Sequence, residues 1–336
     1  MRYLAQSTAG RPRRVVGLAA ACALASTATT ASLALATAPA QAAPAATAKI
    51  HYSFKTINNN NDPTFNQLLG INDAGKIAGY FGSGAKGHPN KGYTLTPPYH
   101  QVDFRNQNFP GSKQTQVTGL NNGDIQVGFY SKMNTASGSN NNFGFYSING
   151  THFHKVNFPA KNPANPPVDQ LLGVNDSKLA VGFYLDDKGN SHGYLYNINT
   201  KVYVSVSPSQ LGTGVTSVTP TGINDPDSIC GFFTNSKGKT VGFLVRRASP
   251  HLFTLNKPGA DATMPFGVNK FGLVVGVYTV GSKNFGFTWD RKHGFQTIKD
   301  PNGPNQTFVN GINSAGDLVG FYVDKKGNTD GFLAKQ

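Results

Sequence analysis

Short apolar runs, separated by Gly, Asn, Asp and Pro, follow one another along most of the chain. They lack the 3.6-residue spacing of an amphipathic helix, and they are rich in Val, Phe, Tyr and Ile. Such runs between turn-forming residues are typical of β-strands, so the pattern predicts an all-β fold.

The runs belong to an internal repeat. The motif G-[IVL]-N-x6-G occurs six times, and two large apolar residues follow its second glycine in each copy. Successive copies are 44 to 54 residues apart. The copies start at Gly70, Gly119, Gly173, Gly222, Gly267 and Gly311.

A third glycine, followed by an aromatic residue, comes later in every copy, as in Gly193-Tyr194. Each unit therefore resolves into four strands, which we call a to d. Strand a ends at the G-[IVL]-N, strand b holds the second glycine and strand c holds the Gly-aromatic pair. Four strands at this period predict a six-bladed β-propeller.

The two ends of the repeat region support a closed ring. Copy six ends at Gln336 without a strand d, whereas residues 50–57 resemble the strand d segment Phe295-Gln296-Thr297-Ile298. We predict that residues 50–57 complete the last blade and that the propeller spans residues 49–336. Such closure removes two exposed sheet edges.

The repeated core resembles the HAF-repeat family of extracellular repeat proteins over residues 70–333. The resemblance implies secretion and a repeat β architecture, and it brings no catalytic motif. Only His192-Gly193-Tyr194 keeps the His of the His-Gly-Phe form, and Lys91, Phe143, Val241, Phe285 and Asp330 replace it in the other copies.

Residues 1–42 are predicted to be a secretory signal peptide. Four arginines precede the uncharged stretch 15–36, and Ala40-Gln41-Ala42 fits the cleavage rule. A membrane anchor, a twin-arginine signal and lipoprotein processing at Cys22 are less favoured alternatives. Residues 43–48 are predicted to be a disordered leader. We expect a secreted, extracellular protein without membrane insertion.

The amino-acid composition limits the kinds of site that the chain can form. The formal net charge is +14, and all 16 acidic residues are Asp. The absence of Glu excludes H-E-x-x-H zinc sites and glycosidase Glu pairs. Cys230 is the only thiol after the signal peptide, so no internal disulfide is predicted, and its place in the repeat indicates a small buried residue.

Other motifs favour structural interpretations. Gly82–Gly87 satisfies G-x-G-x-x-G, but a strand rather than a helix is expected after it, which favours a flexible loop. The segments 186–190 and 324–328 resemble calcium loops but fit Gly-containing turns better. His152 and His154 share one face of an outer strand without a third ligand. No catalytic residue, metal or cofactor is predicted.

One basic constellation points to a function. Every b–c loop carries lysine, and the d–a loops, which lie at the same end of a propeller, carry further basic residues. The same loops carry eight Asp, so the fourteen basic residues leave a local net charge of +6. A ring of such charges would focus the electric field at the channel mouth. The b–c residues are Lys86, Lys91, Lys132, Lys188, Lys237, Lys239, Lys283, Lys325 and Lys326, and the d–a residues are Arg105, Lys113, Lys161, Lys257 and Lys299.

Three functions remain open at this point. The first is a monomeric binding module for an acidic polysaccharide or cell-surface polymer, with Lys86, Lys132, Lys188, Lys237, Lys239, Lys283, Lys325, Lys326 and Arg105 as candidate ligand-binding residues. The second is a polysaccharide-degrading enzyme, with a lyase favoured over a hydrolase. The third is a structural or protein-interaction role. Nucleic acid is a weaker candidate partner, because no helix or RNA-binding motif accompanies the charge.

Overall fold

The computed structural model describes residues 51–133, 141–206, 208, 211–246 and 251–336. The predicted signal peptide and the leader at residues 43–48 lie outside the described residues. Within the described part, no helix has the length and hydropathy of a membrane span.

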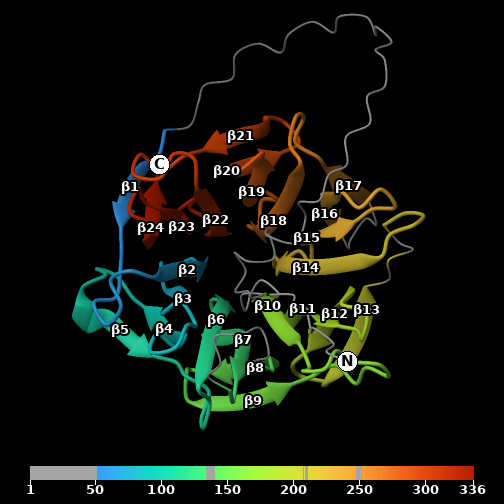
Figure 1. The fold of residues 1–336 in the computed structure, drawn as a ribbon, viewed down its shortest axis with the longest axis horizontal. Coiled ribbons are helices and arrows are strands. Elements are labelled where there is room, and N and C mark those ends of the chain that lie inside the picture. The colour runs from blue at the N-terminus through green and yellow to red at the C-terminus, as the bar shows by residue number, and fades with distance from the viewer. Residues whose placement is uncertain (1–50, 134–140, 207, 209–210, 247–250) are drawn as a thin grey trace, which may run out of the picture.

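Six four-stranded antiparallel sheets surround a central axis, so the predicted six-bladed propeller is confirmed (Figure 1). In order from strand a to strand d, blade 1 is β2 (Asn66–Ile71), β3 (Ile77–Phe81), β4 (Lys91–Leu95) and β5 (Phe104–Asn106). Blade 2 is β6 (Gln114–Leu120), β7 (Ile125–Ser131), β8 (Phe143–Ile148) and β9 (His152–Val156). Blade 3 is β10 (Asp169–Val174), β11 (Leu179–Leu185), β12 (Ser191–Asn197) and β13 (Val202–Val206).

The second half repeats this order. Blade 4 is β14 (Ser217–Ile223), β15 (Ile229–Thr234), β16 (Thr240–Arg246) and β17 (His251–Leu255). Blade 5 is β18 (Ala262–Val268), β19 (Val274–Val280), β20 (Lys283–Asp290) and β21 (Gly294–Ile298). Blade 6 is β22 (Thr307–Ile312), β23 (Leu318–Val323), β24 (Thr329–Lys335) and β1 (Ser53–Thr56).

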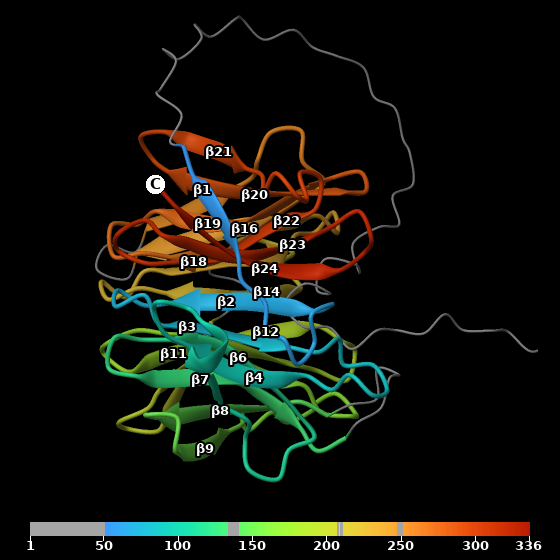
Figure 2. The ribbon, with the colours of Figure 1, turned by 90° about the vertical axis from the view of Figure 1, so that its left-hand side faces the viewer.

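Ring closure follows the predicted scheme. The first strand, β1, pairs antiparallel with β24, from Ser53 opposite Lys335 to Thr56 opposite Phe332. Figures 1 and 2 show the blue β1 beside the red strands of the last blade. The N-terminal strand thereby covers the edge that β24 would otherwise expose.

The three glycines that recur in every repeat have distinct packing roles. A Cβ on Gly70 would lie 3.1 Å from the Cα of Gly119 in the next blade, because the inner strands meet there. On Gly79 it would lie 2.3 Å from the carbonyl oxygen of Gln67, next to the bulge that each strand a makes. On Gly92 it would lie 2.9 Å from a methyl group of Val117 in blade 2. The repeat thus preserves space inside and between blades.

The aromatic residue after the third glycine packs into the core. All six copies are almost completely buried: Tyr93, Phe145, Tyr194, Phe243, Phe287 and Phe332. Each lies opposite a strand b glycine in the antiparallel register. Large rings facing glycines give dense packing without steric overlap.

Candidate functional site

The antiparallel topology separates the loops into two ends of the propeller. The a–b and c–d turns lie at one end, which we call the a–b end. The b–c and d–a loops lie at the other end, and we call the b–c loops and their basic residues the lysine loops.

At the a–b end, the repeated asparagines form a closed ring of hydrogen bonds. The Asn72 side chain donates from Nδ2 to the backbone carbonyl of Asn121 at 3.2 Å, and Asn121 donates to the carbonyl of Asn175 at 2.9 Å. The pattern continues through Asn224, Asn269 and Asn313 and returns to Asn72. Every blade is therefore joined to the next at the axis.

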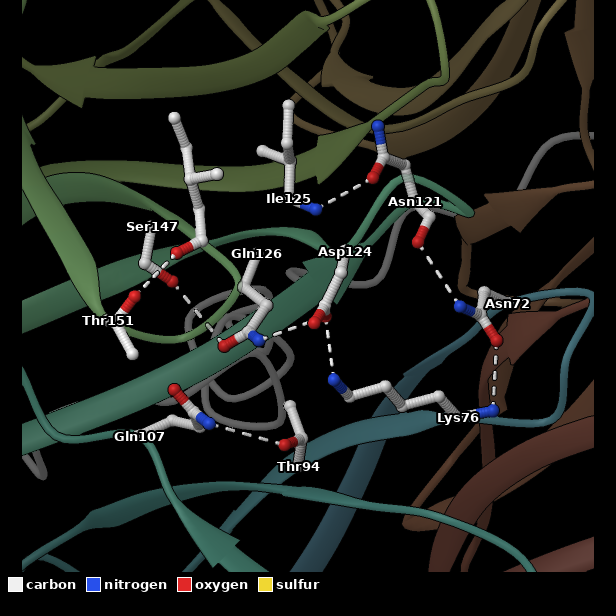
Figure 3. Close-up of polar contacts among 11 residues, drawn as sticks. Asn72, Lys76, Thr94, Gln107, Asn121, Asp124, Ile125, Gln126, Ser147 and Thr151 are labelled. Carbon is white, nitrogen blue, oxygen red and sulfur yellow. Dashed lines mark hydrogen bonds and ion pairs between the residues drawn. The ribbon is translucent and has the colours of Figure 1, made fainter.

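The same asparagines also organise their own turns. The Oδ1 atom of Asn72 accepts from the amide of Lys76, and that of Asn121 accepts from the amide of Ile125 at 2.8 Å, as Figure 3 shows. Three of these turns, from Asn72 to Gly75, Asn269 to Gly272 and Asn313 to Gly316, are closed by a bond from the glycine amide to the asparagine carbonyl. One repeated side-chain type thus supports both the turns and the closure of the ring.

Polar contacts between blades 1 and 2 continue away from the axis (Figure 3). The Lys76 ammonium lies 2.7 Å from a carboxylate oxygen of Asp124. That oxygen also accepts from the Gln126 amide, whose own oxygen accepts from the Ser147 hydroxyl. Gln126 and Ser147 are fully buried, so these contacts satisfy polar groups inside the blade interface.

An axial cavity of about 70 Å³ opens at this end. Its aliphatic wall is formed by one residue per blade just before each asparagine: Ile71, Leu120, Val174, Ile223, Val268 and Ile312. The asparagine ring follows, and an outer rim is formed by the next residue of each blade: Asp73, Asn122, Asp176, Asp225, Lys270 and Ser314. We call these six residues the axial rim.

Hydrogen bonds link most of the axial rim. The amide of Asn122 donates to Asp176 at 2.8 Å, and the amide of Asp176 donates to Asp225 at 2.9 Å. Burial favours the neutral form of Asp73, but bonds from the Ser314 amide and hydroxyl and the charge of Lys270 outweigh it, so the pKa of Asp73 is lowered. Asp73 is therefore ionised near neutral pH.

The axial rim was not predicted from the sequence, because the residue after each repeated asparagine differs between blades. The position of these residues could have predicted the rim, because each directly follows a repeated asparagine at the innermost turn. The chemistry of the ring becomes visible only when the six turns are brought together.

The candidate binding residues lie at the opposite end. Lys86, Lys132, Lys188, Lys237, Lys325 and Lys326 are exposed in the b–c loops, whereas Lys239 is half-buried and Lys283 is the exposed first residue of β20. They come from six different blades, and no hydrogen bond or ion pair among the described residues joins two of them. The structure thus distributes them around the propeller.

Three loop placements were wrong. Lys91 and Lys283 are the first residues of strands β4 and β20 and do not lie in b–c loops. Arg105 lies in the outermost strand β5, opposite Thr94, and not in a d–a loop. Its guanidinium donates to the backbone carbonyls of Val102 and Phe104. A short 3-10 helix, Gln101–Asp103, precedes β5 and places this strand later in the chain than the repeat period suggests.

The centre of this end is packed. Inner-strand residues near the lysine loops are buried, among them Asn66, Gln67, Gln116 and Phe308. The lysines therefore stand on loop tips around closely packed inner strands, whereas the prediction placed them around an open channel mouth. The axial cavity described above opens at the other end.

The aspartates near the lysine loops have local partners. Asp186 accepts from the backbone amides of Lys188 and Asn190 and lies 2.9 Å from His192. Asp324 accepts in the same way from Lys326 and Asn328. These bonds confirm the interpretation of both segments as turns.

The remaining motifs also have structural roles. Gly82, Gly84 and Gly87 have positive φ in the loop between β3 and β4. Cys230 is fully buried, and burial raises the pKa of its thiol to about 12, which opposes a nucleophilic role. His152 and His154 lie on outer strand β9, as predicted. Among the described residues, no three His, Cys or acidic side chains are placed to share a metal ion.

No protein-family model matches the chain, and no curated protein matches it in sequence. Several solved structures are similar in fold. The putative TolB from Agrobacterium tumefaciens has a TM-score of 0.52 at 13% identity, with 84% of this chain and 97% of that chain covered.

Two further matches are more distant in structure. The Aleuria aurantia lectin has a TM-score of 0.49 at 11% identity, with 80% of this chain and 91% of that chain covered. The virginiamycin B lyase from Staphylococcus aureus has a TM-score of 0.46 at 10% identity, with 84% and 88% covered. At these identities the likeness shows the β-propeller fold alone, and the HAF-repeat resemblance stays a prediction.

Proposed function

We propose that the chain is a secreted binding protein that holds an acidic polysaccharide, or another anionic cell-surface polymer, on its lysine loops. Secretion rests on the predicted signal peptide and the HAF-repeat resemblance. The binding role rests on how charge is distributed between the two ends of the propeller.

The observation that carries the proposal is that none of the candidate lysines forms an ion pair with a carboxylate within the part of the chain that the structure describes. Among the described residues, the two ion pairs between lysine and carboxylate are Lys76–Asp124 and Lys335–Asp317, and both lie at the a–b end. At the lysine loops, the carboxylates of Asp62 and Asp186 instead contact His88 and His192. The exposed ammonium groups therefore remain available to an external polyanion.

The loops also suit an extended ligand. Their lysines are spread over all six blades on exposed hairpins, so a long polymer can contact several of them at once. Each contact contributes little alone, because exposed ion pairs are weak, but several in parallel give useful avidity.

The test is binding of the secreted protein to polygalacturonate, with neutral dextran as the matched polymer. Affinity for polygalacturonate should fall more than about ten-fold between about 50 and 500 mM NaCl, because salt screens exposed charges. Dextran should not bind. Equal binding of both polymers, or affinity that does not change with salt, would contradict the proposal.

One cluster favours a second candidate function, β-elimination in a uronate polymer. In blade 3, His192 Nε2 lies 2.9 Å from Asp186, and the Tyr184 ring stacks on the imidazole with centroids 5.0 Å apart. Lys188 lies between Asp186 and His192 in the same hairpin. This set offers a base oriented by a carboxylate and a cation for the uronate.

The two functions are separable. A lyase would release an unsaturated product that absorbs in the ultraviolet, and His192→Ala should abolish the signal while His152→Ala on outer strand β9 keeps it. Binding of polygalacturonate without any rise in absorbance would contradict the lyase and leave the binding function in place.

A further inference from the structure

A small polar pocket lies between blades 1 and 2 at the lysine-loop end. Its volume is about 10 Å³, which is room for one group of the size of a water molecule. Asn90 at the start of the third strand of blade 1 and Gln114, Gln116 and Ser131 of blade 2 are among the residues that line it, and all four are buried. We call this site the amide pocket.

Two hydrogen-bond acceptors of the amide pocket have no donor. The Oε1 atoms of Gln114 and Gln116 accept no hydrogen bond from the residues that the structure describes. Gln114 is 4% exposed and Gln116 is 2% exposed. A buried acceptor without a donor costs free energy, so a guest that donates a hydrogen bond here would be stabilised.

The hydrogen bonds around the pocket explain why these oxygens are left over. Asn90 donates from Nδ2 to the carbonyl oxygen of Gly82 at 2.6 Å, and its Oδ1 accepts from Gln116 Nε2 at 3.0 Å. Gln114 donates from Nε2 to the carbonyl oxygen of Met133 at 3.3 Å. The donors of the three amides are thus directed to other acceptors, whereas two of their three side-chain oxygens have no donor.

The interface between blades 5 and 6 shows that the fold can satisfy the same position internally. Gln306 lies five residues before the first glycine of its repeat, as Gln114 does, and Asn284 lies two residues before the third glycine, as Asn90 does. There, Asn284 donates from Nδ2 to Gln306 Oε1 at 2.8 Å. Asn90 donates to Gly82 instead, so the Gln114 oxygen stays open to a guest.

Two exposed lysines stand beside the amide pocket. A Cβ on Gly84 would lie 3.2 Å from Gln114 Oε1, so the glycine-containing loop between β3 and β4 reaches the pocket. Lys86 lies two residues further along this loop, and Lys132 directly follows the lining residue Ser131. Their charges disfavour a cationic guest and attract a molecule that carries negative charge.

The chemistry of the pocket selects a hydroxyl group as the guest. An anionic group would place its oxygens against acceptor oxygens, and a cation would meet the lysines. An amide N–H brings a carbonyl and a carbon substituent, which exceed the volume of the pocket. A hydroxyl group is small enough, carries no charge and can donate to Gln114 Oε1, the less buried of the two acceptors.

We propose that the amide pocket is a subsite for one sugar hydroxyl group of the bound polymer. The hydroxyl donates to Gln114 Oε1 while Lys86 and Lys132 contact carboxylates of the same chain. Gln116 is a positioning residue, because its amide group binds Asn90. This inference rests on the proposed function and narrows its ligand to a polymer that carries hydroxyl groups as well as negative charge, such as a polyuronate.

The first experiment compares the affinity of the unaltered protein for polygalacturonate and for poly-L-glutamate of matched length at the same low salt. Poly-L-glutamate has the carboxylates but no hydroxyl groups, so polygalacturonate should bind about five-fold more tightly, the effect of one hydrogen bond. Equal affinity would overturn the subsite and leave the binding of anionic polymers in place. No binding of polygalacturonate would overturn both proposals.

The second experiment uses the same substitution at the same repeat position of two blades. Gln114→Met removes the open acceptor without changing charge, so polygalacturonate affinity should fall about five-fold and poly-L-glutamate affinity should stay the same. Gln306→Met is the control, because its oxygen already pairs with Asn284, and it should leave both affinities unchanged.

Thermal unfolding of the two variants shows whether the fold is retained. Unchanged polygalacturonate affinity in a folded Gln114→Met, or an equal loss in both variants, would overturn the proposal and indicate that the amide pocket holds solvent only. If Gln114→Met does not fold, the comparison of the two polymers on the unaltered protein still decides the question.

Discussion

The a–b end and the lysine-loop end of the propeller connect the same blades but obey different constraints. At the a–b end, all six turns place an asparagine at the axis, and each side chain must reach the next blade. At the lysine-loop end, the b–c connections differ in length between blades. Closure of the ring therefore constrains the turns at the a–b end, whereas the loops at the other end can vary in length and sequence.

This difference separates two kinds of repeated residue. Glycine and asparagine recur around the axis because backbones approach closely and turns must join. Lysine recurs in the lysine loops without a packing partner that requires it. A repeated residue with a structural partner reports the fold, whereas a repeated residue without one is a candidate for function.

The largest expected contrast between the two regions is steric. In Gly320→Ala, the new Cβ would lie 1.9 Å from the carbonyl oxygen of Phe308, so we expect a loss of more than about 3 kcal/mol in unfolding free energy. Gly189→Ala in a lysine loop meets no atom within 4 Å and costs about 1 kcal/mol through its positive φ of 82°. Urea unfolding measures both. Similar losses would show that the interior of a blade is no more tightly packed than the loops.

Asp169 offers a test through pH at the interface of blades 2 and 3. Burial raises the pKa of Asp169 to about 7, although bonds from Tyr194 and the Phe158 amide and the charge of Lys155 act in the other direction. The folded state keeps this proton while the unfolded state loses it, so the stability contribution is complete below about pH 4 and declines as pH rises towards 7.

We therefore compare the unaltered protein with Asp169→Asn, which cannot titrate. Between about pH 4 and 8, the difference in unfolding free energy should move by about 3 kcal/mol in favour of the variant. Other titrating groups are present in both proteins and cancel. A difference that stays constant over this range would show that Asp169 is ionised in the folded state.

Asparagine substitutions compare the two ends directly. Asn175→Ala removes the bond to the carbonyl of Asn224 and the cap on the amide of Leu179, and both groups are near the axis. We expect a loss of about 2 kcal/mol. Asn235→Ala in a lysine loop removes caps on the amides of Lys237 and Lys239, which water can replace, and should cost less than about 1 kcal/mol. Equal losses in urea unfolding would contradict the structural importance of the ring.

The smallest expected effect is an increase in the free energy of unfolding. Lys178 has a φ of 61° at the turn position where Gly75, Gly272 and Gly316 stand in other blades. Lys178→Gly removes this strain, so we expect stabilisation by about 0.5 kcal/mol, reduced by the flexibility that glycine adds to the unfolded chain. Thermal unfolding measures the change. A destabilised variant would show that the lysine side chain supports the turn.

Much of the fold was predictable because its constraints are local and repeated. The glycine columns marked strands a, b and c, and the missing strand d in copy six indicated the pairing of β1 with β24. Arg105 was misplaced because strand d lies at the rim, where few contacts fix its position. The helix Gln101–Asp103 could therefore shift it without disturbing the repeat.

The side chains at the two ends of the propeller were less predictable than the fold. The axial rim forms from residues that differ between blades, and its bonds join positions such as Asn122 and Asp176, which are 54 residues apart. No local pattern reports such a contact. The lysines were found from the sequence, but the packed centre between them was not, because burial of Gln67 and Gln116 depends on all six inner strands.

The most direct test of the binding proposal changes the same charge at each end. One variant carries Lys188→Gln, Lys237→Gln and Lys326→Gln in the lysine loops, and its control carries Lys178→Gln, Lys201→Gln and Lys292→Gln in turns at the a–b end. We predict that polygalacturonate affinity at low salt falls more than about ten-fold in the first variant and less than about two-fold in the control. Equal loss in both variants would contradict the proposal and would show that only the net charge of the protein attracts the polymer.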